Sequence, residues 1–299
     1  MGRTGRALGM LVLVSSGAQG ACRLERAADV PVRVVEGFPI VSASIGAKPV
    51  SLLLDTGAQG HLVLPDAVTA LGLQVLPGTV PVVGTGGTSQ APVAVIEGLR
   101  LGSVSLPPAP APVIPLPALP RVSPMLAGLL GAPLLARYDL DLDVAAGRIG
   151  LYEAGGCGAA VPALGPLMTV VKLEITQDRE ALLPVRVNGQ DLIAVLDTGS
   201  RATLLTEAAG RRLGLHAPVS ANTATGVDGQ RLPLQHVRVR ELSVGDDVRR
   251  DAPVSIAPLQ LGPADMLLGL DYLRQRRVWI SYVTGQLAIA LPSPAASAR

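Results

Sequence analysis

Hydrophobic and polar positions alternate over short stretches of this chain, and the stretches are separated by glycine, proline and asparagine. Alternation with a period of two between such turn residues is typical of β-strands. In two places a turn signal, Gly46-Ala47 and Asn188-Gly189, leads into an apolar run, Leu52–Leu54 and Ala194–Leu196. Each apolar run predicts a strand that is buried on both faces. With 34 glycines and 26 prolines in the chain, long helices are not expected.

The pattern after each apolar run predicts the same series of shorter elements. A short strand comes first, then a short helix that a glycine ends, then a β-hairpin with a glycine-rich tip. Each series closes with a strand, a turn and a strand. The predicted short strands are 62–64 and 203–205, the helices 65–71 and 206–213, and the closing strands 138–144, 149–152, 278–282 and 287–291. This predicts an all-β fold with short helices, built from two similar units.

The similarity of the two units is an internal repeat in the sequence itself. Residues 45–73 align without a gap with residues 187–215, at an offset of 142, and nine of these 29 positions are identical. Further matches follow with small shifts, among them Leu129-Leu130-Gly131 with Leu267-Leu268-Gly269. We therefore predict lobes at 28–154 and 168–292, joined by a linker at 155–167 that is rich in glycine and alanine.

Composition excludes several classes of protein. Apolar residues make up 48% of the chain and charged residues 16%, so neither a disordered protein nor a coiled coil is expected. A net charge of +2 and only six aromatic residues argue against nucleic acid as a partner. Three histidines and two cysteines without ligand spacing predict no metal site.

The first 21 residues have the pattern of an export signal. Arg3 and Arg6 precede an apolar run, and small residues suited to cleavage follow it. We therefore expect an exported protein of the periplasm or cell envelope. Gly20-Ala21-Cys22 also fits the end of a lipoprotein signal, so a lipid on Cys22 is an alternative. A disulfide between Cys22 and Cys157 is possible in an oxidising compartment, and the sequence leaves these alternatives open.

Two Asp-Thr-Gly motifs lie at equivalent positions of the repeat. Asp55-Thr56-Gly57-Ala58 and Asp197-Thr198-Gly199-Ser200 each follow the apolar run, and each unit later carries Leu-Leu-Gly. This combination resembles the retropepsin-like aspartic proteases over nearly the whole chain after the signal. Retroviral enzymes of this kind are homodimers with one Asp from each subunit. The chain resembles a fused form with both, as in pepsin, with the active site between two small β-barrel lobes.

The resemblance implies a role for each residue of the motifs. Asp55 and Asp197 would share one proton, activate a water molecule and hydrolyse a peptide bond as catalytic residues. Thr56 and Thr198 would cross-link the two loops and hold the pair rigid. Gly57 and Gly199 would let the two carboxyl groups approach, since glycine has no β-carbon. Neither a metal nor a cofactor is implied.

The hairpin tips are candidate substrate contacts. Thr85, Gly86 and Gly87 in the first unit, and Thr225 and Gly226 in the second, would belong to mobile flaps that close over a peptide. The alternative is an exposed turn without a ligand. His61, six positions after Asp55, could line the same cleft, or lie in the core or at the surface. Trp279 is expected in the core or between the lobes.

Three functions from different classes compete. The first is an active aspartic endopeptidase that acts on a peptide or protein substrate as a monomer, with any membrane attachment through Cys22 alone. The second is a catalytically idle peptide-binding protein of the envelope with the same fold. The third is a structural β-rich lipoprotein. The intact Asp-Thr pair in both units favours the endopeptidase.

Overall fold

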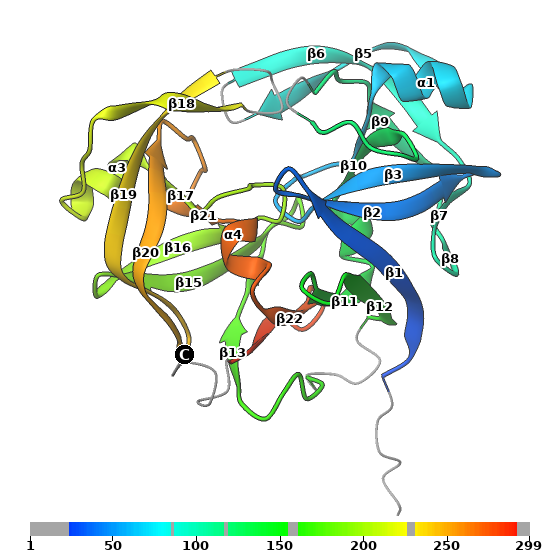
Figure 1. Ribbon diagram of the computed structural model, residues 1–299. Helices are drawn as coiled ribbons and strands as arrows, with labels where there is room; N and C mark the ends of the chain where they lie inside the picture. Colours follow the sequence, from blue (N-terminus) through cyan, green and yellow to red (C-terminus); the bar gives the residue numbers. More distant parts are fainter. Residues whose placement is uncertain (1–23, 85–86, 117–118, 155–160, 226–230, 292–299) are drawn as a thin grey trace, which may run out of the picture.

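The computed structural model describes residues 24–84, 87–116, 119–154, 161–225 and 231–291. Strands dominate in these residues, and the helices among them have four to seven residues. Two halves of similar build stand side by side, the first on the right in Figure 1 and the second on the left. The all-β, two-lobed fold expected from the repeat is confirmed. The predicted signal, Cys22 and Cys157 lie outside the described residues, so export, lipidation and the disulfide stay predictions.

The first lobe holds the elements from β1 to β12. A parallel pairing joins β3 to β10, and the β5–β6 hairpin pairs with β9 as a separate three-stranded sheet. Its elements are β1 (Arg26–Val35), β2 (Phe38–Ile45), β3 (Lys48–Asp55), β4 (Leu62–Val63), α1 (Pro65–Leu71), β5 (Gln74–Gly84), β6 (Gly87–Ile96), β7 (Leu99–Leu101), β8 (Val104–Ser105), β9 (Ala109–Pro112), β10 (Leu126–Gly131), α2 (Ala132–Leu135), β11 (Tyr138–Asp143) and β12 (Arg148–Glu153).

The second lobe repeats this plan. The corresponding parallel pairing joins β16 to β21, and β17 also runs parallel to β20. The long hairpin is formed by β18 and β19, with β19 also pairing with β20. Its elements are β13 (Met168–Lys172), β14 (Glu174–Ile175), β15 (Ala181–Val187), β16 (Gln190–Leu196), β17 (Leu204–Thr206), α3 (Glu207–Arg212), β18 (Val219–Thr225), β19 (Arg231–Val244), β20 (Asp247–Ala257), β21 (Met266–Leu268), α4 (Leu270–Leu273), β22 (Arg277–Ser281) and β23 (Gln286–Ala290).

A six-stranded antiparallel arrangement joins the lobes, in the order β13-β23-β22-β11-β12-β1. The central pair, β11 and β22, comes from different lobes and aligns Leu140 with Ile280. At one end of this pair, Arg277 donates from Nε and Nη2 to the two carboxylate oxygens of Asp141, each at 2.8 Å. Asp141 is buried, so the ion pair satisfies a charge that would otherwise be costly inside the protein.

The core is continuous through this sheet. One cluster of buried apolar side chains includes residues of both lobes, with Leu140, Leu142, Val278 and Ile280 at the junction. Trp279, expected in the core or between the lobes, is buried on the other side of the same sheet and contacts Tyr152, with ring centroids 4.9 Å apart. The lobes therefore share one hydrophobic core and are not independent domains joined only by a linker.

Capping and turn residues in the sequence predicted most of the short elements correctly. The helix expected at 65–71 is α1, and it ends at Gly72, whose φ of 70° is left-handed. The helix expected at 206–213 is α3, where Thr206 is the N-cap and its hydroxyl accepts from the Ala209 N–H at 3.1 Å. The proline-rich run after residue 107 belongs to the first lobe, because β9 pairs with β6.

Candidate active site

Each Asp-Thr-Gly motif begins where a buried strand ends. Asp55 is the last residue of β3, and Asp197 directly follows β16. The strands that carry Leu-Leu-Gly, β10 and β21, run parallel beside them, with Leu54 opposite Leu130 and Leu196 opposite Leu268. The two motifs of each unit, about 70 residues apart in the sequence, are therefore neighbours in the sheet.

The glycine of each Leu-Leu-Gly is needed for this arrangement. A β-carbon at Gly131 would lie 2.0 Å from the carbonyl oxygen of Gly60, and one at Gly269 would lie 2.4 Å from that of Ala202. Such distances are far inside van der Waals contact, so no side chain fits. The loop after each Asp-Thr-Gly passes directly over this glycine.

The two threonines lock the motifs together across the lobes. The Thr56 hydroxyl donates to the carbonyl of Leu196 at 2.6 Å and accepts from the Thr198 N–H at 3.1 Å. The Thr198 hydroxyl donates to the carbonyl of Leu54 at 2.8 Å and accepts from the Thr56 N–H at 3.0 Å. Both threonines are fully buried. The predicted cross-links are thus present, and water cannot compete for them.

The interlock brings the two carboxyl groups into contact. A hydrogen bond links the side chains of Asp55 and Asp197. A β-carbon at Gly57 would lie 2.6 Å from Cγ of Asp197, and one at Gly199 would lie 2.3 Å from Cγ of Asp55. The absence of β-carbons at these glycines is therefore what admits each carboxyl group to the space beside the opposite loop.

Burial and mutual repulsion disfavour two negative charges here. Asp55 and Asp197 are 8% and 9% exposed. The pKa of Asp55 is raised well above its ordinary value by burial and by the neighbouring charge of Asp197. The pKa of Asp197 is also raised by burial, but the N–H groups of Ser200 and Gly199 oppose that rise. The pair therefore holds one proton over a wide pH range.

The backbone donors make the two carboxyl groups unequal. Asp197 Oδ1 accepts from the N–H of Gly199 at 2.8 Å and that of Ser200 at 3.0 Å. Asp55 Oδ1 accepts from the N–H of Gly57 at 3.0 Å, and the Ala58 N–H acts in the same direction on its pKa, while the contact with Asp197 raises the pKa of Asp55 and lowers that of Asp197. Stronger donation to a carboxylate favours its ionised form, so Asp197 is the better site for the negative charge and Asp55 for the proton.

The hairpins β5–β6 and β18–β19 extend toward one another at the top of the molecule (Figure 1). Of the candidate flap residues, Gly87 begins β6 and Thr225 ends β18. Thr85, Gly86 and Gly226 lie outside the described residues. Val83, two residues before the gap, is 73% exposed. Substrate contact by the tips stays a prediction.

His61 is half-buried, and burial lowers the pKa of its imidazole, with the carbonyl of Pro110 acting in the opposite direction. Among the described residues, no group of three or more His, Cys, Asp and Glu side chains could hold a metal ion. No helix in the described ranges has the length and apolar character needed to cross a membrane.

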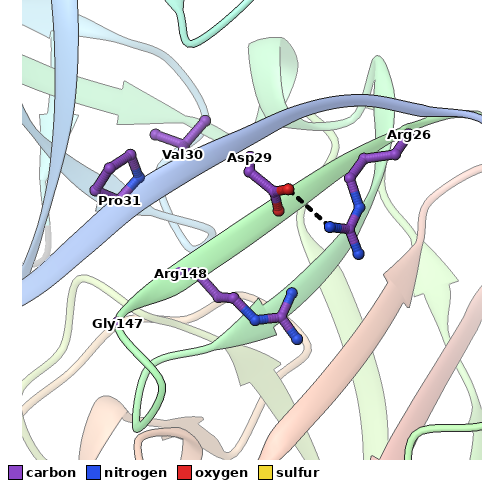
Figure 2. A pocket seen from close by; sticks show the side chains of 6 residues that line it. All are labelled: Arg26, Asp29, Val30, Pro31, Gly147 and Arg148. Carbon is purple, nitrogen blue, oxygen red and sulfur yellow. Dashed lines mark hydrogen bonds and ion pairs between the residues drawn. The ribbon is translucent and has the colours of Figure 1, made fainter.

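Two surface concavities lie away from the pair of aspartates. The first, of about 420 Å³, lies beside β1 and β12 (Figure 2). Its two arginines are already engaged, since Arg26 binds Asp29 at 2.7 Å and Arg148 lies 3.5 Å from Asp141. It therefore has little free charge for a ligand.

The second concavity, of about 460 Å³, brings Ser255, His236 and Asp271 to one surface of the second lobe. His236 Nδ1 lies 2.9 Å from the Ser255 hydroxyl, but Asp271 accepts from Thr203 instead of the histidine. The relay of a serine hydrolase needs the acid on the histidine, so these residues do not form one.

Comparison with known proteins agrees with this geometry. A family model described as aspartyl protease matches residues 41–134 and 183–272, which together exceed half of the chain and contain both Asp-Thr-Gly motifs. The chain belongs to the aspartyl protease family.

The similarity of this aspartyl protease to individual relatives covers a smaller part of the chain. The protein is 33% identical to Protein DDI1 homolog 1 of Bos taurus over 107 residues, which are 35% of this chain and 26% of the relative. Protein DDI1 homolog 2 of Homo sapiens is 30% identical over a stretch of the same length. The chain thus spans about a quarter of the length of these relatives. The crystal structure of Basic 7S globulin from soybean matches 91% of this chain and 96% of its own, with 13% identity and a TM-score of 0.51; this shows a shared fold.

Sequence reasoning missed the cross-lobe contacts that flank the pair. Gln59 Nε2 donates to Glu180 Oε2 at 3.0 Å, and the Arg201 guanidinium lies 5.1 Å from the centre of the Phe38 ring. Gln59 and Arg201 are separated by the repeat offset of 142, and so are Phe38 and Glu180. Extending the offset beyond the identical residues would have paired these positions, although it could not show that they touch.

Proposed function

We propose that this aspartyl protease is an active endopeptidase that hydrolyses peptide bonds through Asp55 and Asp197. The observation that carries the proposal is the hydrogen-bonded carboxyl pair, buried and held by the threonine interlock. A protein that only bound peptides would gain nothing from two carboxyl groups whose burial costs free energy. The raised pKa of both groups supports acid–base chemistry by a single shared proton.

The unequal surroundings of the two carboxyl groups support different roles for them in this proposal. Asp197, as carboxylate, takes a proton from a water molecule, whose oxygen bonds to the carbonyl carbon of the peptide. Asp55 gives its proton to the carbonyl oxygen, so that a neutral tetrahedral diol forms. Asp197 then returns its proton to the leaving nitrogen while Asp55 takes one from a diol hydroxyl. The carbon–nitrogen bond breaks, and the singly protonated pair is restored.

Matched substitutions test the proposal. Wild type, Asp55→Asn and Asp197→Asn are incubated with a peptide library, and the products are identified by mass spectrometry. We expect each variant to lose about 10²–10⁴-fold in rate, and the double variant to lose little more, because the two residues act as a unit. Asp191→Asn is the control. This exposed residue lies on β16, the strand that precedes Asp197, and it pairs with Arg186 at the surface.

The competing function has a distinct outcome. If wild type binds library peptides without cleaving them from acid to neutral pH, and both Asn variants bind equally well, the chain is a peptide-binding protein. Cleavage that survives either substitution, or that a metal chelator stops, contradicts the aspartic mechanism. Thermal unfolding of each variant verifies that the fold is retained.

A further inference from the structure

The two sides of the aspartate pair are related by the repeat but differ in chemistry. Gln59 lies four residues after Asp55, and Arg201 lies four residues after Asp197. Each of the two side chains contacts the other lobe. Their partners also correspond: Phe38 begins β2, and Glu180 directly precedes β15. The hydrogen bonds of Thr56 and Thr198 also correspond between the two lobes, which are related by an approximate two-fold axis through the aspartate pair. The Gln59–Glu180 and Arg201–Phe38 contacts therefore lie on opposite sides of the pair. A glutamine–carboxylate contact flanks one side and an arginine–aromatic contact the other.

Glu180 gives its side of the pair a negative character. It is half-buried, and burial together with the charges of Asp178 and Asp197 raises the pKa of its carboxyl group, while the hydrogen bond from Gln59 acts in the opposite direction. Within the described part of the chain, Glu180 forms no ion pair. When Glu180 is ionised, Gln59 holds its carboxylate in place, and no cation of the described residues neutralises the charge. The influence of Asp197 on its pKa places it within electrostatic reach of the pair.

Arg201 gives the opposite side a positive character. Its guanidinium lies over the ring of Phe38, its Nη1 donates to the carbonyl of Glu36 at 3.5 Å, and its aliphatic stem packs on Gly37. A β-carbon at Gly37 would lie 3.0 Å from Cδ of Arg201. Arg201 is exposed, and among the described residues it has no carboxylate partner. The arginine is thus positioned by an aromatic ring and a carbonyl, which leave its charge available.

We infer that these two contacts give the substrate a direction: Glu180 recognises a basic side chain of the peptide on one side of the scissile bond, and Arg201 an acidic one on the other. This inference rests on the proposed function. A peptide extended across the pair must pass one contact before and the other after the bond that is cut. In a symmetric enzyme the two sides would carry the same charge, and peptide charge could not set the direction of binding. Here opposite charges steer the chain one way and repel it the other way.

The experiment compares charge preferences at each peptide position. Wild type, Glu180→Gln and Arg201→Gln cleave a library in which Lys, Glu and Gln are equally represented at every position around an apolar core. We expect wild type to prefer Lys over Glu by about fivefold at one position, as partly screened charge pairs allow. Glu180→Gln should abolish this preference, and Arg201→Gln should abolish a preference for Glu on the other side of the scissile bond. Glutamine at 180 can still bind Gln59, so folding should be unaffected.

The control is Glu97→Gln, which removes a carboxylate from an exposed turn between β6 and β7, beside the Gly46 hairpin. It should keep the wild-type preferences. Wild-type cleavage with no charge preference, or preferences that neither variant alters, would overturn the inference and leave the proposed function standing. A loss of preference on the same side of the bond in both variants would also overturn it. Absence of any wild-type cleavage would overturn the proposed function and the inference with it.

Discussion

The main chain of Gly199 passes so close to Asp55 that a β-carbon at residue 199 would lie 2.3 Å from the carboxyl carbon. The same relation holds between Gly57 and Asp197, at 2.6 Å. Each lobe therefore supplies an aspartate to the pair and the empty space that the other aspartate occupies. The site depends on the absence of a β-carbon at Gly57 and Gly199 as much as on the carboxyl groups of the aspartates.

Gly199→Ala should remove most of the activity while leaving the lobes folded. The added methyl group must displace the Asp55 carboxyl group, and a displacement of about 1 Å costs on the order of 10²-fold in rate. The measurement is kcat/KM on a library-derived peptide. Gly60→Ala is the control, because a β-carbon there meets nothing within 4 Å. Equal activity in both variants would contradict the close packing of the pair.

Thr56→Val should destabilise the protein, because it removes a hydroxyl without changing the shape of the side chain. The carbonyl of Leu196 and the N–H of Thr198 would lose their partner in a fully buried place. Unpartnered buried groups cost about 1–3 kcal/mol, to be measured by urea unfolding. Thr56→Ser keeps the hydroxyl and should recover most of the loss. A serine variant as unstable as the valine variant would show that packing, and not hydrogen bonding, is the cause.

Activity should depend on pH as a bell. The reaction needs one proton on the pair, and burial raises the pKa of both carboxyl groups. Activity should fall as the pH rises through the upper apparent pKa, when both groups ionise, and also below the lower one, when both are protonated. The optimum should lie on the acidic side of neutral. A rate that continues to rise into alkaline solution would exclude the shared proton.

Stability should report the same ionisation without any substrate. Asp55 has a higher pKa in the folded than in the unfolded protein, so the folded state binds more protons between the two values. The free energy of unfolding of the wild type therefore falls as the pH rises through that interval. Asp55→Asn cannot titrate at this position. Its stability relative to wild type should increase with pH, as followed by urea unfolding from pH 4 to 7. A difference that stays constant would contradict the raised pKa.

Specific activity should not change on dilution. Both aspartates belong to one chain, and the six-stranded arrangement that joins the lobes is formed within it. A monomer therefore contains the entire site. Specific activity measured over a thousandfold range of concentration, with sedimentation at its extremes, tests this. A steep loss of activity at the concentration where a dimer dissociates would show that a second copy is required.

The aspartates and threonines could be predicted from the sequence because the repeat places the same motif after the same apolar run twice. The pairing of Leu-Leu-Gly with the catalytic strand follows the same logic, since Gly131 and Gly269 recur at equivalent places. Local turn and capping signals were sufficient for α1 and α3. Each of these features can be recognised from a short motif or a single capping residue in the sequence.

The contacts between the lobes that lie outside the two Asp-Thr-Gly motifs could not be predicted in this way. Glu180 and Gln59 are 121 positions apart, and neither belongs to a motif. The pairing of β11 with β22, and of Asp141 with Arg277, depends on which edges meet after both lobes have folded. Strand signals give the strands but not the order in which they associate, because hydrogen-bonding edges are chemically alike.

The junction of β11 with β22 determines when the two lobes can first join during synthesis of the chain. On the ribosome the first lobe is complete after β12, yet a chain of that length carries one of the two Asp-Thr-Gly motifs and therefore only Asp55 of the pair. The second aspartate follows β16, and the strand that joins the lobes, β22, emerges only at residues 277–281. The pair of aspartates within one chain therefore cannot be completed until nearly all of that chain has been synthesised.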